Sequence, residues 1–464
     1  MVATLLVALA AGIGASAGTE TQRTPPDRAS VAGTDEFVSD GLNGTNHYPS
    51  VAVNDETGDI LVVWQHTTAS GTVVRGRLYK AQPDGSHQAR PHFVLSGDAA
   101  YAGNPHVVWA PWRGRYVVVW DTFDPTAGLV PTSIEGVEVT AAGNPKKQRS
   151  IATLKTARTN YYPRLGVDPV QNKLLLSYTA LPNQPGDNKT GIVFTFVNNK
   201  LKQRGKKLYA ATAVFKAGSP ARQNPFRRSD LASVPENRRS QPWQGLGFAT
   251  SGVIDFYEAD GTLVNPVIAQ RNQMTWLITD TNGLGNEFQQ FTGHGGDAGA
   301  VIPIPEDPAN DGFGHTRQSM FVRGNFEAEF LDDVFNGDLD GYLLVGSLAQ
   351  GSVDGAYLPR NYDNDIPGQN ADLPIRRDRT ARLADADFAH LLVPKGKFIL
   401  RQGIKWTGPN NARRVAFGKA KKLFNTNNKL VWLATASAPE LGAKAAAWAK
   451  SRGAATEVRL HIYE

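Results

Sequence analysis

The sequence predicts an all-β protein built from repeated four-stranded antiparallel sheets, and three observations lead to this prediction. A sequence pattern recurs along the chain at intervals of 56 and 58 residues. Each recurrence contains short runs of β-branched and aromatic residues, which favour strands. The 464 residues include Gly 46 and Pro 28, about one residue in six, as expected for a chain with many turns.

Each repeat begins with a proline, at Pro49, Pro105 and Pro163. A proline at the start of a strand costs no ladder hydrogen bond, because its missing N–H lies outside the paired region. An apolar run ends 15 residues after each proline in an aromatic side chain. Such continuous runs are typical of strands buried on both faces. The aromatic residues are Trp64, Trp120 and Tyr178, and we expect the two tryptophans to pack between neighbouring sheets.

The first two repeats each supply four strands joined by turns rich in Asn, Asp and Gly. The strands are predicted at 49–53, 59–65, 73–79 and 91–95 in the first unit and at 105–109, 115–121, 134–139 and 150–154 in the second. The third unit begins in the same way, with strands at 163–167 and 173–178.

Four antiparallel strands repeated at about 55 residues are the signature of a β-propeller blade. A parallel β-helix has shorter coils, and a β-sandwich does not repeat at this period. Later units diverge, and their second and third strands are predicted at 274–279, 341–347 with 355–358, and 430–435 with 456–463. The prediction is therefore six blades, with seven or five as the alternatives.

Three further segments are assigned around these strands. Residues 252–257 fit either a seventh blade or the first strand of the fourth. Residues 216–241 are predicted as a long basic insertion. The Ala-rich segment 439–450, with Pro439 near its start, is predicted as a helix in the last blade, because alanine is the strongest helix former.

The ends of the chain predict that the N-terminal strand closes the ring. Phe37 precedes the next repeat proline by 12 residues, as Phe93 and Ile151 do in the following units. The chain ends on a third-strand pattern, so a strand at 36–39 should be the fourth strand of the last blade. Closure of this kind hides sheet edges.

The N-terminal segment predicts export. Residues 1–17 are short, apolar and end in Ala15-Ser16-Ala17, as in a secretory signal peptide, and the run is too short for a membrane span. No transmembrane anchor is predicted. Residues 18–34 are polar and fit a disordered lead-in, which leaves 35–464 as one propeller domain. Because the chain has no cysteine, disulfides, thiolate metal sites and cysteine nucleophiles are excluded.

The charge is positive and clustered. Lys and Arg number 49 against 43 Asp and Glu, and the formal net charge is +6. Such clusters fit solvated loops or electrostatic contact with an anionic cell envelope. No nucleic-acid-binding motif accompanies them. They comprise Arg222, Arg227, Arg228, Arg238 and Arg239; Arg376, Arg377, Arg379 and Arg382; and Arg413, Arg414, Lys419, Lys421 and Lys422.

The loops that enter first strands and leave second strands should lie on one face of the propeller, around its channel. They carry polar and aromatic residues that suit a polar extracellular partner, a glycan or a protein. The same residues could instead simply shape the turns. The predicted ligand-binding residues are His47, Tyr48, Tyr101, Asn104, Asp121, Asn160 and Tyr161.

Two alternatives involve carboxylates. Channel carboxylates could make the protein a glycoside hydrolase, which uses a pair of acids; the candidates are Asp121, Asp168, Asp255 and Asp280. The segment 332–341 has oxygen ligands at alternating positions, a pattern compatible with Ca²⁺; the candidate ligands are Asp332, Asn336, Asp338 and Asp340. No other cofactor is predicted, and no nucleophile elbow, P-loop or zinc-protease motif is found.

The pattern P-x-V-A-x-(N/D) followed by L-V-V-W resembles the blades of secreted bacterial β-propeller repeat proteins. The resemblance covers residues 36 to 200 clearly and implies the fold, whereas propellers host both binding and catalysis. The Asp-box of sialidases, S-x-D-x-G-x-T-W, is absent from the sequence.

Overall fold

The structure is a computed structural model of the 464-residue chain. It describes residues 29–30, 35–97, 101–124, 130–153, 158–168, 172–182, 190–213, 226–233, 244–253, 272–280, 289–292, 326–331, 341–347, 353–359, 385–387, 390–395, 397–407, 414–417, 419–427, 430–438, 441, 443–453 and 455–463.

The described residues form seven antiparallel sheets, called blades 1 to 7 in chain order of their first strands. Blade 1 contains β3 (Thr45–Val53), β4 (Ile60–Thr68), β5 (Gly71–Ala81), β6 (His87–Ala89), β7 (Phe93–Val94) and β1 (Ala29–Ser30). Blade 2 contains β8 (Ala102–Ala110), β9 (Arg115–Asp124), β10 (Val130–Thr140) and β11 (Arg149–Thr153), with the 3-10 turn η1 (Pro111–Arg113) between β8 and β9. Blade 3 contains β12 (Arg158–Asp168), β13 (Lys173–Pro182), β14 (Thr190–Val197) and β15 (Gln203–Ala213).

Blade 4 contains β16 (Phe226–Ser233), β17 (Gln244–Val253), β18 (Asn272–Asp280) and β19 (Gln289–Thr292). Blade 5 contains β20 (Phe326–Leu331), β21 (Gly341–Ser347) and β22 (Val353–Pro359). Blade 6 contains β23 (Asp385–Asp387), β24 (His390–Lys395), β25 (Phe398–Thr407), β26 (Arg414–Phe417) and β27 (Lys421–Asn425). Blade 7 contains β28 (Leu430–Ala438), β29 (Ala443–Arg452), β30 (Ala455–Tyr463) and β2 (Asp35–Phe37).

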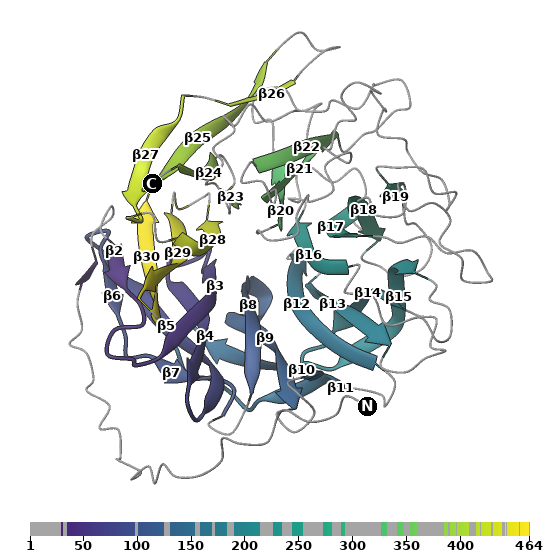
Figure 1. The fold of residues 1–464 in the computed structure, drawn as a ribbon, viewed down its shortest axis with the longest axis horizontal. Coiled ribbons are helices and arrows are strands. Elements are labelled where there is room, and N and C mark those ends of the chain that lie inside the picture. The colour runs from purple at the N-terminus through teal and green to yellow at the C-terminus, as the bar shows by residue number, and fades with distance from the viewer. Residues whose placement is uncertain are drawn as a thin grey trace, which may run out of the picture.

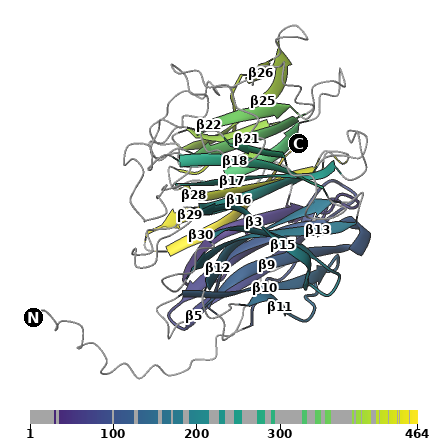
Figure 2. The same ribbon diagram turned by 90° about the vertical axis from the view of Figure 1, so that its right-hand side faces the viewer.

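The blades are arranged around a common centre, which makes the protein an all-β propeller (Figure 1). The first strand of each blade is innermost. Each of these strands contacts the first strand of the next blade, and β28 of blade 7 contacts β3 of blade 1. Viewed from the side, the strands cross the thickness of the assembly (Figure 2).

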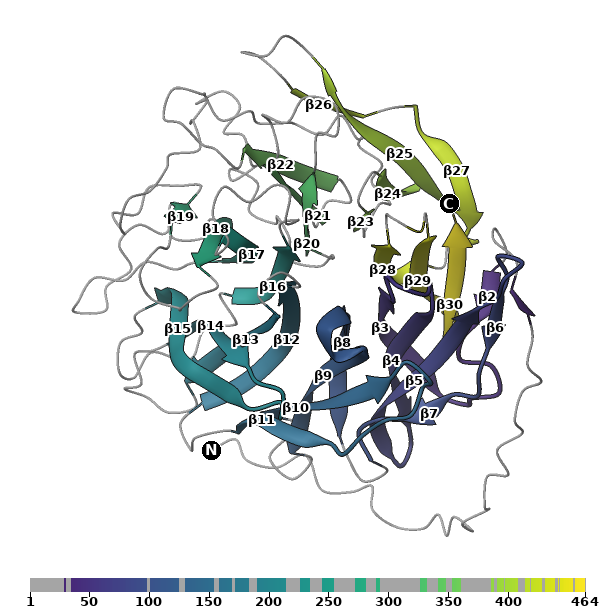
Figure 3. The same ribbon diagram turned by 180° about the vertical axis from the view of Figure 1, so that it is seen from behind.

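The N-terminal strand β2 belongs to the last blade, beside the C-terminal strand β30 (Figure 3). Phe37 pairs with Arg459, and the N–H of Val38 donates to the carbonyl of Val458 at 3.0 Å. The spacing that relates Phe37 to Phe93 and Ile151 therefore marks the same structural position, the fourth strand of a blade.

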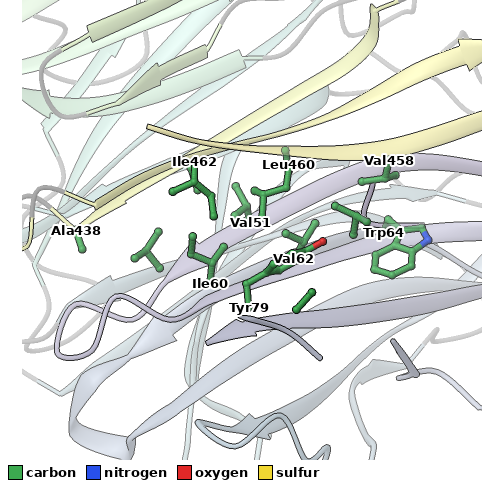
Figure 4. Close-up of a cluster of buried hydrophobic side chains, with 14 residues drawn as sticks. Val51, Ile60, Val62, Trp64, Tyr79, Ala438, Val458, Leu460 and Ile462 are labelled. Atoms are coloured by element: carbon green, nitrogen blue, oxygen red, sulfur yellow. The ribbon is translucent and has the colours of Figure 1, made fainter. Parts of the chain in front are cut away.

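Apolar side chains fill the space between blades. The cluster between blades 7 and 1 combines β28, β29 and β30 with β3, β4 and β5, and includes Trp64 (Figure 4). The next cluster joins blades 1 and 2 and includes Trp120, and a third joins blades 2 and 3. Both tryptophans have no exposed surface. Their predicted packing between blades is confirmed.

The predicted helix at 439–450 is wrong, because its described part from Ala443 onward is the strand β29. This strand pairs with β28 on one side and with β30 on the other. Residues 445–449, which include Trp448, are buried between blades. Two ladders of hydrogen bonds and burial on both faces outweigh the few tenths of a kcal/mol by which alanine favours a helix.

The described residues form seven sheets, one more than the six predicted, because the strands of blade 6 lack the sequence pattern by which the other blades were found. Its second strand β24 contains Pro394, and β25 carries Arg401 and Lys405 among its apolar residues, so neither strand shows a continuous β-branched run.

Other predicted segments take different places. Residues 274–279, predicted as a second strand, lie in β18, the third strand of blade 4. Residues 252–253 end β17, the second strand of that blade, and 254–257 lie outside the described residues. Part of the predicted basic insertion forms β16, and Ala29–Ser30 of the predicted lead-in pair with β6.

The predicted signal peptide lies outside the described residues. Within the parts of the chain that are described, no helix is long and apolar enough to cross a membrane.

Candidate functional site

The same backbone distortion occurs in the first strands of blades 1, 2 and 3. The register shifts between His47 and Ser50, between Gly103 and His106, and between Tyr161 and Arg164, which marks a β-bulge in each strand. The residue before the repeat proline has a left-handed conformation in all three, with φ of 49° at Tyr48, 48° at Asn104 and 53° at Tyr162.

A left-handed conformation costs a residue with a side chain roughly 1–2 kcal/mol. The conformation recurs where the first strand begins and the second strand ends, as the pairing of Thr45 with Thr67 and of Ala102 with Thr122 shows. We call this face of blades 1 to 3, at the three bulges, the bulged rim. The two loop sets predicted to share a face do share it.

The N–H of a bulge residue is bonded by the preceding blade. The N–H of Asn104 donates to Oε1 of Gln65 at 3.3 Å, and the N–H of Tyr162 donates to Oδ2 of Asp121 at 3.0 Å. Gln65 and Asp121 each directly follow the buried tryptophan in the second strand of their own blade. The bulges therefore distort their own sheet and also form hydrogen bonds to the preceding blade.

A second set of hydrogen bonds between blades involves the residue after the repeat proline. Oγ of Ser50 accepts the N–H of Val107 at 3.2 Å, and Nδ1 of His106 accepts the N–H of Leu165 at 3.1 Å. Burial, and then the charge of Arg164, hold the pKa of His106 well below its usual value. His106 is therefore neutral, with its proton on Nε2, which leaves Nδ1 free to accept.

Asp121 is the most perturbed carboxyl at the bulged rim. Its Oδ2 accepts from Nδ2 of Asn104 at 2.9 Å as well as from Tyr162, and its Oδ1 has no hydrogen-bond partner among the described residues. Burial raises the pKa of Asp121 to about 7, although these two donors and the charge of Arg164 act in the opposite direction. The side chain has no exposed surface, so it is a buried contact between blades 2 and 3.

Asn46 makes the corresponding contact between blades 1 and 7. Its backbone N–H donates to Oγ1 of Thr456 at 2.7 Å, and its Nδ2 donates to the Thr456 carbonyl at 2.9 Å. Its Oδ1 accepts from Nε1 of Trp64 at 3.0 Å and lies 2.9 Å from Nδ1 of His66. Burial, and then the charges of Arg75 and His92, lower the pKa of His66 to about 4, so the ring is neutral and donates from Nδ1.

The predicted ligand residues of blade 1 differ in how firmly they are held. The ring of Tyr48 packs edge-on against Trp432 of blade 7, with ring centroids 5.0 Å apart. His47 is half-buried 5.9 Å from the Tyr48 ring, and burial lowers its pKa. Tyr48 is thus a contact between blades, and both Tyr48 and His47 keep part of their surface exposed on the rim.

In blade 2, Tyr101 is half-buried directly before β8, and its carbonyl accepts the N–H of Phe123 at 2.6 Å. In blade 3, two further predicted residues lie in β12. Asn160 and Tyr161 pair through their backbones with Ala180 and Thr179, while their side chains lie outside the described residues. The structure brings Asn104 and Asp121 together directly.

Among the described residues, Asp121 lies far from the other candidate carboxylates Asp168 and Asp280. Asp168 lies six residues along β12 from Tyr162, which places it about 20 Å from the Asp121 contact at the opposite end of the strand. Asp280 ends a third strand, also at the end away from the rim. Hydrolytic pairs lie roughly 5 to 10 Å apart. Asp255 and the predicted calcium ligands Asp332, Asn336, Asp338 and Asp340 fall outside the described residues.

The described side chains contain no group of three or more His, Asp or Glu residues that could hold a metal ion. Among the rim residues that sequence reasoning did not select as site residues are Ser50, His106 and Arg164. All three directly follow the repeat proline, so superposing the three repeats would have grouped them.

The chain matches no family profile and no curated protein sequence. Among solved structures, Trypanosoma rangeli sialidase is similar over 94% of this chain and 59% of its own length, at 8% identity and a TM-score of 0.44. This chain thus spans about three fifths of that sialidase.

The β-propeller domain of the Trilobed protease from Pyrococcus furiosus is similar over 92% of this chain and 93% of its own, at 7% identity and a TM-score of 0.42. The Dos1 propeller is similar over 92% and 94%, at 8% identity and a TM-score of 0.38. At these identities and TM-scores the likenesses say nothing about the chemistry of this chain.

Proposed function

We propose that this protein is an exported propeller that binds a polar extracellular partner, a glycan or a protein, at the bulged rim. The observation that carries the proposal is the repeated left-handed bulge at Tyr48, Asn104 and Tyr162. Backbone strain of this kind persists only where the surroundings enforce it, and bulges concentrate beside binding sites.

The side chains around the bulges suit a polar ligand. His47 and Tyr101 have exposed surface beside the strained positions and offer ring faces and hydrogen-bonding groups. Asn46, Asp121 and His106 lie behind them and hold neighbouring blades in register through hydrogen bonds. A ligand would therefore meet a rim whose geometry is fixed in advance, which lowers the entropic cost of binding.

The variant H47A/Y101A tests the proposal on a glycan array and in a pull-down from the extracellular medium. A matched double variant, E56A/N144A, changes exposed residues in turns at the opposite ends of the strands. We expect the rim variant to lose binding of partners captured by the wild type, and the turn variant to keep it. Equal binding by all three proteins would refute the assignment of the rim.

The alternative function is glycoside hydrolysis, and one observation favours it. A carboxyl with a pKa of about 7, such as Asp121, is in the protonation state required of a general acid. Its burial opposes this role because a sugar oxygen must reach the acid. Release of reducing ends from arrayed glycans by the wild type, abolished in D121N, would establish the hydrolase and displace the binding proposal.

A further inference from the structure

The excess of positive over negative charge in this protein comes from two long stretches of the chain. Residues 188–229 contain ten Lys and Arg and no Asp or Glu, and residues 388–439 likewise contain ten and none. The rest of the chain has 29 Lys and Arg against 43 Asp and Glu, a net charge of −14. A net charge of +6 therefore conceals two strongly cationic regions on an anionic molecule.

Each stretch supplies the outer part of one blade. The first includes β14 and β15 at the outer side of blade 3, and the second includes β25, β26 and β27 at the outer side of blade 6 (Figures 1 and 3). Exposed cationic side chains lie at both places. They are Lys200, Lys202 and Arg204 in blade 3, and Lys397, Lys419, Lys421 and Lys422 in blade 6.

These cations lack anionic partners in the part of the chain that is described. Elsewhere Arg113 and Arg115 share Glu138, and Lys450 and Arg459 share Glu457. No such ion pair is found for these seven exposed cations among the described residues. Lys421 lies opposite Arg401 in the pairing of β27 with β25, which adds a second cation beside it on this sheet.

Lysines on an edge strand also discourage pairing with another chain. One or two lysines are enough for that purpose. Edge protection does not require that acidic residues be excluded from 42 and from 52 consecutive positions.

The aromatic residues at both edges argue against nucleic acid as the ligand. The Phe398 ring in blade 6 has Nζ of Lys422 at 4.5 Å and Nζ of Lys397 at 5.4 Å from its centroid. The Phe196 ring in blade 3 has Nζ of Lys173 at 5.4 Å. Because ammonium groups lie against these rings, the rings are not open platforms for stacked bases.

A lipid surface fits no better. Peripheral membrane binding combines basic side chains with apolar ones that enter the bilayer. The one exposed large hydrophobic residue among the described residues is Leu441, which belongs to neither edge. With nucleic acid and lipid surfaces disfavoured, the class of anionic ligand that fits best is a charged, polar, extended polymer. Exposed amides such as Asn425 and Asn427 stand beside the blade 6 lysines and can bond sugar hydroxyls.

We infer that the outer edges of blades 3 and 6 are two binding sites for an acidic polysaccharide, a polymer bearing carboxylate groups. The exposed cations are close together in each site, because Lys200, Lys202 and Arg204 span the β14–β15 turn and Lys419, Lys421 and Lys422 span the start of β27, so neighbouring carboxylates of one polymer can meet several of them. These sites lie away from the bulged rim, so the inference is independent of the proposed function. Two separate edges would let one molecule link two polymer chains or hold one long chain at two points.

Isothermal titration of the full chain with short oligogalacturonates tests the inference. We expect two sites in the wild type, one in K200Q/K202Q/R204Q, one in K419Q/K421Q/K422Q and none in the combined variant. Three ionic contacts per site should give a plot of log K against log salt concentration with a slope of about −2, by analogy with flexible polyanions. Thermal unfolding of each variant shows whether it is folded.

The matched control is K146Q/K147Q/R149Q, which removes the same charge from exposed positions in blade 2, whose strand β10 carries Glu135 and Glu138. It should keep both sites. An unchanged number of sites in the edge variants would overturn the inference, as would an equal loss in the control. Tighter binding of a single-stranded oligonucleotide or of anionic lipid vesicles than of polygalacturonate would overturn the choice of ligand.

Discussion

Replacing Asp121 by Asn should make the protein more stable at neutral pH and leave it nearly unchanged in acid. The folded protein raises the pKa of this carboxyl from 3.8 to about 7. Between these values the folded state retains a proton that the unfolded chain has released. The free energy of unfolding of the wild type therefore falls as the pH rises through this window and levels off above it.

The size of the effect follows from the shift. Three pKa units at about 1.4 kcal/mol each give about 4 kcal/mol, an upper value because the folded protein can relax around the carboxylate. An Asn side chain can still accept from Asn104 and Tyr162 through its oxygen, and it does not ionise. The difference in free energy of unfolding, D121N minus wild type, should therefore rise by up to about 4 kcal/mol across this window.

Urea unfolding followed by tryptophan fluorescence, at a series of pH values from acid to neutral, measures this difference. Using the difference is essential because His66, with its pKa lowered to about 4, contributes the opposite slope in both proteins. As a control, D84N removes an exposed carboxyl whose pKa is lowered, first by its bond to the Ser86 hydroxyl. Wild type should exceed D84N in stability at neutral pH and lose that advantage in acid. A flat D121N difference would refute the reasoning.

Three other predictions concern the contacts between blades and the revised last blade. H106L removes the acceptor for Leu165 and should lower the free energy of unfolding by about 1–3 kcal/mol, whereas H106N keeps an acceptor and should lose less, as measured by urea unfolding. N46A removes the side-chain bonds to Nε1 of Trp64, Nδ1 of His66 and the carbonyl of Thr456, and should cost more than about 3 kcal/mol, visible as a lower melting temperature; equal melting would contradict its role between blades 1 and 7. A447L overfills the space between β29 and its neighbours and should cost about 1–3 kcal/mol in the same melt, while a helix with this residue on its surface would be unaffected.

Much of the fold could be predicted because propeller blades repeat. The proline spacing, the apolar run and the closing aromatic recur where each strand faces the same surroundings, so Trp64 and Trp120 could be placed between blades from their positions alone. Blade 6 and the alanine strand β29 could not be found in this way. Their strands are specified by what packs on both sides of them, and their local residues favour other structures.

The sequence also placed the loop residues on one face but could not say which of them point outward. Asp121 and Asn104 are polar and lie beside a turn, which suggests a ligand site. In the folded protein they bond to each other and to the backbone of the next blade. That outcome depends on the β-bulge at Tyr162, which takes this residue out of the strand pairing of its own sheet. Asp121 of the neighbouring blade then accepts the Tyr162 N–H.

By itself, the sequence determined that the chain is all-β, that its unit is a four-stranded blade, and that its N-terminal strand shares a position with Phe93 and Ile151. These features are local and periodic, so the residues themselves carry them. Tertiary structure decided the identity of each blade's inner strand, the burial of the rim carboxyl and the placement of the two cationic stretches on outer strands. Each of these depends on packing between segments distant in sequence, which no local pattern records.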